Sequence, residues 1–294
     1  MLHKLKALLL ALSLWSPLSA AAAPISRDDP ESTDPGRKGI STARGSAVVV
    51  TANPLASTAA LAALKNGGSA IDALVTAQAV LAVVEPQSSG LAGGGFLLHW
   101  EAKQRQLSVL DGREVAPERS RPGDLLDGAG DPLPWRQATS QANAIGIPGT
   151  VALLWEAHQN HGRLPWAQAL QPAIRLASDG FLPSPRLLRS IRLAQRFGVA
   201  HSPEFQALYL PGGQPPAADH PFRNLALARS LRLLAREGGP AFYQGPLAQQ
   251  ILDGVNALRA SEPNFRGWSS ADLSSYAVVP VSYTHLTLPT NLCV

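Results

Sequence analysis

The alternation of hydrophobic and polar residues along this chain predicts short strands and helices joined by many turns. Residues 46–51 form a brief apolar run, typical of a buried strand. Two further runs, at residues 96–100 and 106–110, predict the strands of a hairpin that turns across residues 101–105. The predicted strand at residues 46–51 precedes every predicted helix, and the predicted hairpin lies later in the chain.

Helix start signals lie between the first strand and the hairpin. Asn53 precedes a proline and predicts the start of a helix over residues 54–66. Ser69 and Asp72 resemble a capping box, in which each side chain satisfies a backbone N–H at the start of a helix. We therefore expect a second helix that begins after Ser69 and runs to about Val84.

After the hairpin, and from Pro148 onward, the pattern becomes mainly helical. Apolar residues recur at helical spacing in five segments. Helices are expected at residues 150–161, 165–178, 185–197, 224–237 and 247–260. Gly162, Gly180 and Gly238 stand where three of them are expected to end. No internal repeat is present in the sequence.

The N-terminal end has the features of an export signal. Residues 1–23 contain Lys4 and Lys6, then an apolar stretch, then a run of small residues, which is the order found in a secretory signal peptide. Residues 24–45 are polar and predict a flexible leader. The product is expected to be exported, to a bacterial periplasm or to the extracellular space, without a membrane anchor.

The C-terminal end differs in amino-acid composition from the rest of the chain. Residues 282–294 contain no acid and no arginine, are rich in threonine and leucine, and carry Cys293. They resemble the peptide produced when sequencing-adapter DNA is translated at a truncated gene end. The native sequence is expected to stop near Val281, so that residues 46–281 form the folded region.

Composition narrows the class of protein. The chain has 294 residues, of which 45% are hydrophobic and 16% charged, and this is typical of a globular protein. The net charge of +4 comes from 25 basic and 21 acidic residues scattered along the chain, which does not favour nucleic-acid binding. A single cysteine excludes an internal disulfide and a multi-thiolate metal site in this chain.

Residues 88–96 form a glycine-rich segment that resembles a phosphate-binding loop only superficially. Such loops need a Gly-Lys-Ser/Thr ending, or a G-x-G-x-x-G pattern that opens a helix. Here the segment ends in Phe96 and leads into a predicted strand. A tight loop, in which backbones approach closely, is therefore favoured over a nucleotide site.

Two rows of polar side chains on predicted helices are weaker candidates. His158 and His161 have a spacing that can bind a metal, but no third ligand accompanies them, so solvent-facing positions are favoured. A row of arginines at helical spacing favours a solvated or acid-paired face over a polyanion site. The row comprises Arg186, Arg189, Arg192 and Arg196. No G-x-S-x-G elbow and no cysteine in a catalytic context is present.

Taken in order, several short motifs resemble the first half of a gamma-glutamyltransferase (gamma-glutamyltranspeptidase) precursor. They are ANPLAS at 52–57, GGSAIDA at 67–73, EPQSSG at 85–90, GGGF at 93–96, DGREVAP at 111–117, GIPGT at 146–150, PAI to DGF across 172–181, FYQG at 242–245, and Asp272-Leu273 with Tyr276. Each motif is unspecific, but their order and spacing are not. Ala92 and Ser69 depart from the glycine and asparagine common in the family.

The resemblance implies an N-terminal-nucleophile hydrolase, an α/β (α+β) fold built as a four-layer αββα sandwich. In that family a precursor cleaves itself into a large and a small subunit. The N-terminal threonine of the small subunit attacks a γ-glutamyl amide such as that of glutathione, and water or an amino acid then resolves the acyl-enzyme. No metal and no organic cofactor is implied.

Arg113 is the site residue that the resemblance assigns to this chain. It matches the family arginine that holds the α-carboxylate of the γ-glutamyl group, and a guanidinium fork suits a carboxylate. Glu114 either orients that arginine or caps the loop. The nucleophilic threonine is expected beyond Val281, and Thr284 is no substitute for it. The chain alone is therefore expected to be inactive, with an incomplete sandwich.

Other functions remain open on the sequence. A related acylase that acts on cephalosporin-type side chains, or a poly-γ-glutamate hydrolase, would share most of these motifs. A periplasmic solute-binding protein would also be exported and α/β, but it would need two lobes of repeated β-α units. The helix-dominated half after Pro148 argues against that class.

Overall fold

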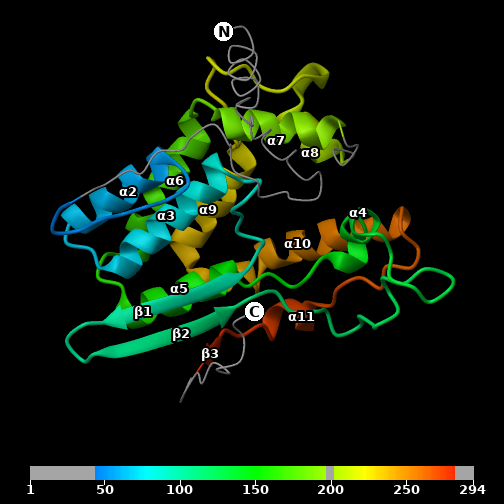
Figure 1. Ribbon diagram of the computed structural model, residues 1–294, viewed down its shortest axis with the longest axis horizontal. Helices are drawn as coiled ribbons and strands as arrows, with labels where there is room; N and C mark the ends of the chain where they lie inside the picture. Colours follow the sequence, from blue (N-terminus) through cyan, green and yellow to red (C-terminus); the bar gives the residue numbers. More distant parts are fainter. Residues whose placement is uncertain (1–43, 197–201, 282–294) are drawn as a thin grey trace, which may run out of the picture. The chain divides into compact units, whose positions relative to one another are not determined.

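The computed structural model describes residues 44–196 and 202–281. In this part of the chain, a group of helices accompanies an antiparallel sheet with the strand order β1-β2-β3 (Figure 1). The strands are β1 (Gly95–Glu101), β2 (Gln106–Gly112) and β3 (Val279–Val281). The helices are α2 (Pro54–Lys65), α3 (Ala70–Val84), α4 (Trp135–Thr139), α5 (Thr150–His161), α6 (Trp166–Asp179), α7 (Pro185–Arg196), α8 (Pro203–Tyr209), α9 (Leu225–Glu237), α10 (Pro246–Ala257) and α11 (Ser270–Ser274).

The two ends of the chain fall largely outside this description. The expected signal peptide at residues 1–23, nearly all of the expected leader, and the tail at residues 282–294 lie outside the described residues. Within residues 44–196 and 202–281, no helix is both long and apolar enough to cross a membrane.

The first two helices begin as their capping residues predict. The Asn53 side chain accepts a hydrogen bond from the Leu55 N–H at 3.0 Å, and a proline occupies the first turn of α2. At α3 the capping box is complete. The Ser69 N–H donates to the Asp72 carboxylate at 2.7 Å, and the Asp72 N–H donates to the Ser69 hydroxyl at 3.2 Å.

The hairpin and the later helices also match the sequence predictions. β1 and β2 pair antiparallel across the four-residue turn at 102–105, and α5 has the expected bounds. The helices α6, α7 and α9 agree with prediction to within one residue at each end. The last predicted helix is α10, which continues as a short 3-10 helix, Leu258–Ala260. The glycines Gly162, Gly180 and Gly238 end three helices as expected.

The strand predicted at residues 46–51 is wrong for the described structure. That segment contains no strand. Val48 and Val50 are 53% and 87% exposed, and only Val49 is partly buried, against alanines of α2 and α3. An apolar run becomes a strand only when a neighbouring strand satisfies its backbone N–H and C=O groups. No strand of the described residues lies beside this segment to do so.

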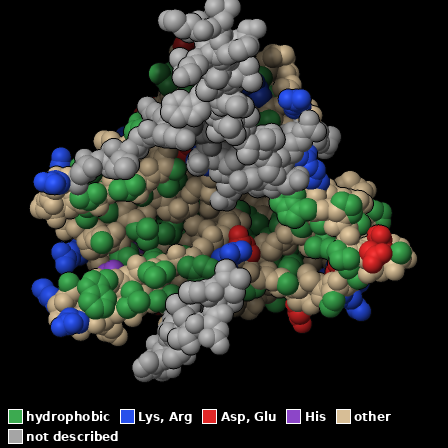
Figure 2. Space-filling view, in the orientation of Figure 1, with side chains coloured by type: hydrophobic (Ala, Val, Ile, Leu, Met, Phe, Trp, Pro, Cys, Tyr) green, Lys and Arg blue, Asp and Glu red, His purple; other side chains and the backbone are tan. Residues whose placement is uncertain are grey.

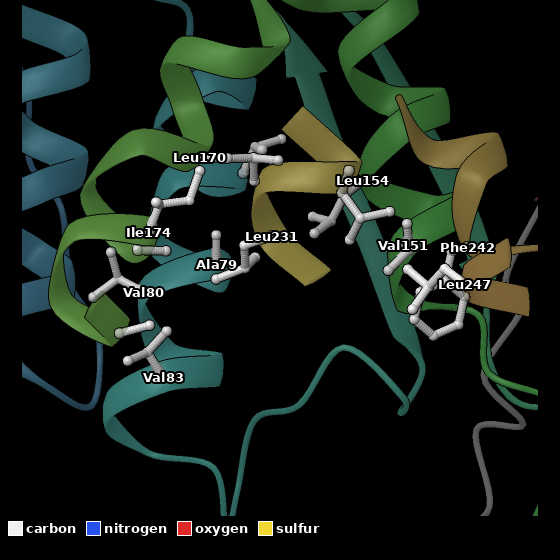
Figure 3. Packing of buried hydrophobic residues seen from close by; sticks show 14 of the residues in the cluster. Ala79, Val80, Val83, Val151, Leu154, Leu170, Ile174, Leu231, Phe242 and Leu247 are labelled. Atoms are coloured by element: carbon white, nitrogen blue, oxygen red, sulfur yellow. The ribbon is translucent and has the colours of Figure 1, made fainter. Parts of the chain in front are cut away.

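The core lies between α3, α6 and α9, and a second part of it lies under the sheet. α3 packs on α2 and on α6, and α6 packs on α9. Figure 3 shows side chains of α3, α6 and α9 in this core. Ala79, Val80 and Val83 of α3 face Leu170 and Ile174 of α6 and Leu231 of α9, while Val151 and Leu154 of α5 meet Phe242 and Leu247. α5 therefore connects the helical core to the strands that it contacts, β1 and β2.

One face of the sheet is apolar and exposed. The register pairs Leu98 with Val109, Trp100 with Leu107, and Phe96 with Asp111. Residues directly opposite in a ladder share a face, so these apolar side chains gather on one side. Leu98 is 67% exposed there, whereas Leu97, on the other face, is buried. Figure 2 shows hydrophobic side chains along β1 and β2 in this view. We call this surface the open sheet face.

Candidate functional site

Arg113 lies immediately after β2, at the end of the hairpin nearest the helical core. Its backbone N–H donates to the Asp111 carboxylate at 2.8 Å, which tightens the turn that follows the strand. Its side chain is 60% exposed, and its Nε donates to the Glu114 carboxylate at 3.1 Å. The ring of Phe96 lies under the guanidinium, 5.9 Å from it. Arg113 therefore presents a charged side chain that has one ionic partner among the described residues.

The Glu114 side chain is half-buried beside the glycine loop, and its contacts go to this loop as well as to Arg113. A Cβ at Gly94 would lie 2.7 Å from both the backbone N and a carboxylate oxygen of Glu114. The structure thus places Glu114 as the ion-pair partner of Arg113, wedged against the backbone of residues 93–94. The tight loop predicted for this glycine-rich segment is confirmed.

The glycine loop in turn holds the start of α5. The carbonyl of Gly93 accepts hydrogen bonds from the N–H groups of Gly149 and Thr150, both at 2.9 Å. Two residues after Arg113, Val115 forms an isolated bridge with Ile147 through two backbone hydrogen bonds. Backbone contacts therefore join three segments that are distant in sequence. They are the glycine loop, the start of α5, and residues 113–118, which we call the Arg113 turn.

Two stacked tyrosines connect the Arg113 turn to the start of α5. The Tyr276 hydroxyl donates to the Arg113 carbonyl at 2.7 Å, and the Tyr276 ring stacks on Tyr243 with 5.6 Å between ring centres. The Tyr243 hydroxyl donates to the Pro148 carbonyl and accepts from the Ala152 N–H, each at 3.0 Å. Burial, followed by the charges of Asp111 and Glu114, raises the pKa of Tyr276, so this hydroxyl keeps its proton and acts as a donor.

Asp272 fixes the far end of the same turn. Its carboxylate caps α11 and also accepts the Glu118 N–H at 2.8 Å. Burial alone would favour the protonated acid, but hydrogen bonds from Glu118 and Ser269, together with the charge of Arg119, lower the pKa of Asp272. The carboxylate is therefore ionised at neutral pH.

The structure corrects the interpretation of His158. Its side chain is buried rather than solvent-facing: Nε2 lies 3.0 Å from the Leu164 carbonyl and 3.3 Å from the Asp72 carboxylate. Asp72 also accepts the backbone N–H groups that follow α5, so the histidine joins the end of α5 to the start of α3. His161 instead contacts the ring of His99, with 4.2 Å between ring centres.

The remaining candidates have structural roles. Arg186 donates to the Ser88 hydroxyl at 2.9 Å and lies 4.0 Å from Glu85, a buried carboxylate that also accepts from Asn53 at 2.7 Å. The other arginines of that row, Arg189, Arg192 and Arg196, are exposed. The expectation of a solvated or acid-paired face is confirmed. Among the described residues, no group of three or more acidic, His or Cys side chains is placed to hold a metal ion.

A surface depression of about 750 Å³ lies beside the Glu118 end of the Arg113 turn. It is lined by Glu118, Arg119, Ser120, Arg121 and Arg266 and does not include Arg113. One of its arginines, Arg266, is 3.4 Å from Asp124. The exposed Arg113 guanidinium thus does not line this depression.

The sequence singles out Arg113 as a candidate, but it does not predict the groups that hold its backbone. Tyr276 and Asp272 were noticed only as part of a motif, because a hydroxyl acting on a residue 163 positions earlier leaves no local signal. The tyrosine in FYQG, Tyr243, was likewise a motif letter without a role. A tyrosine that recurs in the late motifs is the one sequence feature from which such contacts could be suspected.

Comparison with solved structures defines the class of protein first. The structure superposes on gamma-glutamyltranspeptidase from Helicobacter pylori with a TM-score of 0.72 and 28% identity, over 82% of this chain and 66% of that one. Such neighbours are N-terminal-nucleophile hydrolases, so the expected α/β fold class is confirmed.

The sequence comparisons then give the family. Residues 56–289 match the family described as Gamma-glutamyltranspeptidase, and the chain belongs to that family. It is 32% identical to the glutathione hydrolase proenzyme of Bacillus subtilis (strain 168) over 93% of this chain and 44% of that protein. It is 35% identical to the acylase ACY 1 proenzyme of Pseudomonas sp. (strain V22) over 79% of this chain and 41% of that protein.

The chain spans less than half the length of these curated relatives. Membership of an enzyme family favours the enzyme interpretation over a periplasmic solute-binding protein. Because the match covers less than half of the relatives' length, the catalytic activity belongs to the proposal that follows.

Proposed function

We propose that this chain is the large-subunit region of a gamma-glutamyltransferase, or glutathione hydrolase, precursor. The observation that carries the proposal is the exposed Arg113 guanidinium, presented on a turn whose backbone is fixed at both its N–H and its carbonyl. A planar guanidinium with one ionic partner can bind a carboxylate through its remaining N–H groups. The α-carboxylate of a γ-glutamyl group is the ligand that fits this chemistry in this family.

Arg113 would orient the substrate rather than react with it. With the α-carboxylate held, the γ-carbonyl is directed toward the nucleophile, a threonine hydroxyl that we place in the precursor beyond residue 281. The hydroxyl oxygen forms an ester with the γ-carbonyl, the free α-amine of the threonine takes its proton, and the amine leaving group departs with that proton. Water or an amino-acid amine then takes the γ-glutamyl group.

The open sheet face supports a partner subunit. An apolar sheet face is stable in water only when it packs on another layer. We propose that the small subunit of the same precursor covers it. The exposed segment at residues 46–51 would then gain its strand neighbours at the same time, because the missing strands would come from that subunit.

We also propose export, from the signal-peptide pattern of residues 1–23. Expression of the complete precursor in a Gram-negative bacterium, followed by N-terminal sequencing of the periplasmic product, tests this. A mature N-terminus near residue 24 is expected. A product that keeps Lys4 and stays in the cytoplasm would contradict export.

Arg113→Ala in the complete precursor tests the function. Hydrogen bonds to a charged group contribute about 1.5–3 kcal/mol, so KM for a γ-glutamyl anilide should rise at least about tenfold. Self-cleavage, followed by the appearance of two subunits on a gel, should remain intact. Arg192→Ala, at an exposed position on α7, is the matched control. An unchanged KM in Arg113→Ala would count against the assignment.

A second function is favoured by one relative, the acylase ACY 1 proenzyme. Turnover of glutathione and of a glutaryl amide by the same preparation separates the two. Both substrates carry a γ-type carbonyl, but the glutaryl group lacks the α-amine. Preference for the glutaryl amide would favour the acylase function. The isolated 294-residue chain should release no chromogenic aniline from a γ-glutamyl anilide. Release would show that the chain does contain the nucleophile.

A further inference from the structure

We propose that Tyr276 is a positioning residue, which holds the Arg113 turn in the conformation that binds the substrate carboxylate. The inference rests on the proposed function and adds a residue to it. Tyr276 does not reach the substrate in this argument. It acts through the Arg113 carbonyl, to which its hydroxyl donates at 2.7 Å.

The Arg113 side chain has few contacts that fix its direction. It is 60% exposed, and among the described residues its ionic partner is the adjacent Glu114, while the Phe96 ring of β1 lies 5.9 Å from the guanidinium. The direction of the guanidinium therefore depends in large part on the backbone of the turn. The Asp111 contact to the Arg113 N–H is local. The hydrogen bond from Tyr276 ties the backbone of residue 113 to a segment 163 residues later in the chain.

Tyr276 is itself held firmly. Its ring is nearly parallel to that of Tyr243, at an interplanar angle of 12°. Tyr243 is fixed by hydrogen bonds to Pro148 and Ala152 at the start of α5. A Cβ at Gly149 would overlap the Tyr276 hydroxyl and the Gly112 carbonyl, so the hydroxyl fills the space that only a glycine leaves there. The core helix α5 thereby sets the position of the hydroxyl.

A second contact supports the same turn from the same segment. Asp272, four residues before Tyr276, accepts the Glu118 N–H at 2.8 Å. The segment around α11 thus hydrogen-bonds to the turn twice, through Tyr276 at residue 113 and through Asp272 at residue 118. A turn fixed in this way presents its guanidinium without a further loss of backbone freedom on binding, which favours affinity.

The test is Tyr276→Phe in the complete precursor, because phenylalanine keeps the ring stack and removes only the hydroxyl. KM for a γ-glutamyl anilide should rise about three- to tenfold, with kcat changed less than about twofold. Tyr209→Phe is the matched control, since the Tyr209 ring stacks on Phe222 without contact to the turn. An unchanged KM in Tyr276→Phe overturns the proposal.

A double-variant comparison separates positioning from general weakening. When Arg113 is already alanine, Tyr276→Phe should raise KM no further, because the arginine through which it acts is gone. The same fold-increase in both backgrounds would overturn a role through Arg113.

Trypsin gives a readout that does not depend on activity. It cleaves after arginine, and the scissile carbonyl at Arg113 is the group that Tyr276 holds. Tyr276→Phe should speed cleavage between Arg113 and Glu114 severalfold in this chain, whereas Tyr209→Phe should not. An equal rate overturns the positioning role. A wild-type precursor that leaves γ-glutamyl amides intact, with faster cleavage in Tyr276→Phe, would refute the proposed function alone.

Discussion

Single residues around the Arg113 turn are constrained by backbone atoms more than by side chains. Gly94 shows this most directly, because an added methyl group would meet the backbone N of Glu114 and the carbonyl of Gly112, each at 2.7 Å. Backbone atoms in a paired strand cannot move aside cheaply. The residue type at position 94 is thus decided by the approach of the neighbouring turn.

Gly94→Ala should therefore destabilise the chain, whereas Gly95→Ala should not. We expect a loss of about 1–3 kcal/mol in the free energy of unfolding for Gly94→Ala, measured by chemical denaturation. At Gly95 an added methyl group meets no atom within 4 Å, so its change should stay within about 0.5 kcal/mol. Equal losses in the two variants would show that the close approach at Gly94 is absent.

The burial of His158 shows where residue-level reasoning stops. Its spacing from His161 indicates which residues share a helix face, but not what covers that face. In the structure the segment after α5 folds over His158 and brings Leu164 within 3.0 Å. Arg113, by contrast, becomes a candidate from the sequence through its motif, and its substrate-binding role stays a prediction.

Among the secondary-structure elements, those with local signals could be predicted and those that depend on a partner could not. Capping residues set the starts of α2 and α3, and a four-residue turn set the hairpin. The strand expected at residues 46–51 failed because its hydrogen-bond partners are not among the described residues. β3 was not predicted for a related reason, since the three residues Val279–Val281 become a strand only by pairing with β2.

α11 is a short helix whose stability depends on its cap, and this dependence predicts a pH effect. The pKa of Asp272 is lower in the folded chain than its usual 3.8, so its contribution is complete above about pH 3.8 and is lost as the pH falls through the folded pKa. Unfolding free energies of the wild type and of Asp272→Asn should therefore differ near neutral pH and converge in acid.

Denaturant titrations at a series of pH values measure this convergence. Asp253→Asn, at an exposed position on α10, reports the effect of removing a surface carboxylate. A difference between the wild type and Asp272→Asn that stays constant down to strongly acidic pH would show that the capping carboxylate is not responsible.

At the scale of the whole molecule, the open sheet face is the apolar surface that we propose the small subunit covers. Leu98, 67% exposed, lies near the middle of β1 on that face, while the equally apolar Leu182, 59% exposed, lies between α6 and α7. The motifs of the sequence predict a partner subunit, and the register of the hairpin shows which apolar side chains are exposed on the face that we propose it covers.

Leu98→Glu should reduce self-association of the isolated chain and should impair subunit assembly in the complete precursor. A charge buried between two layers without a partner is strongly unfavourable. Sedimentation velocity of the chain, and gel filtration of the processed precursor, measure the two effects. Leu182→Glu is the control, and it should leave both unchanged. Equal behaviour of the two variants would show that the open sheet face is not the interface.

The way Arg113 is held has a consequence for divergence within the family. Its backbone is fixed through its N–H and its carbonyl, groups that every residue other than proline provides, while its side chain lies in solvent. The fold therefore places few demands on the side chain at position 113. Under the proposed function, exchange of that residue would change the chemical group that is recognised, while the glycines and tyrosines around it stay in place.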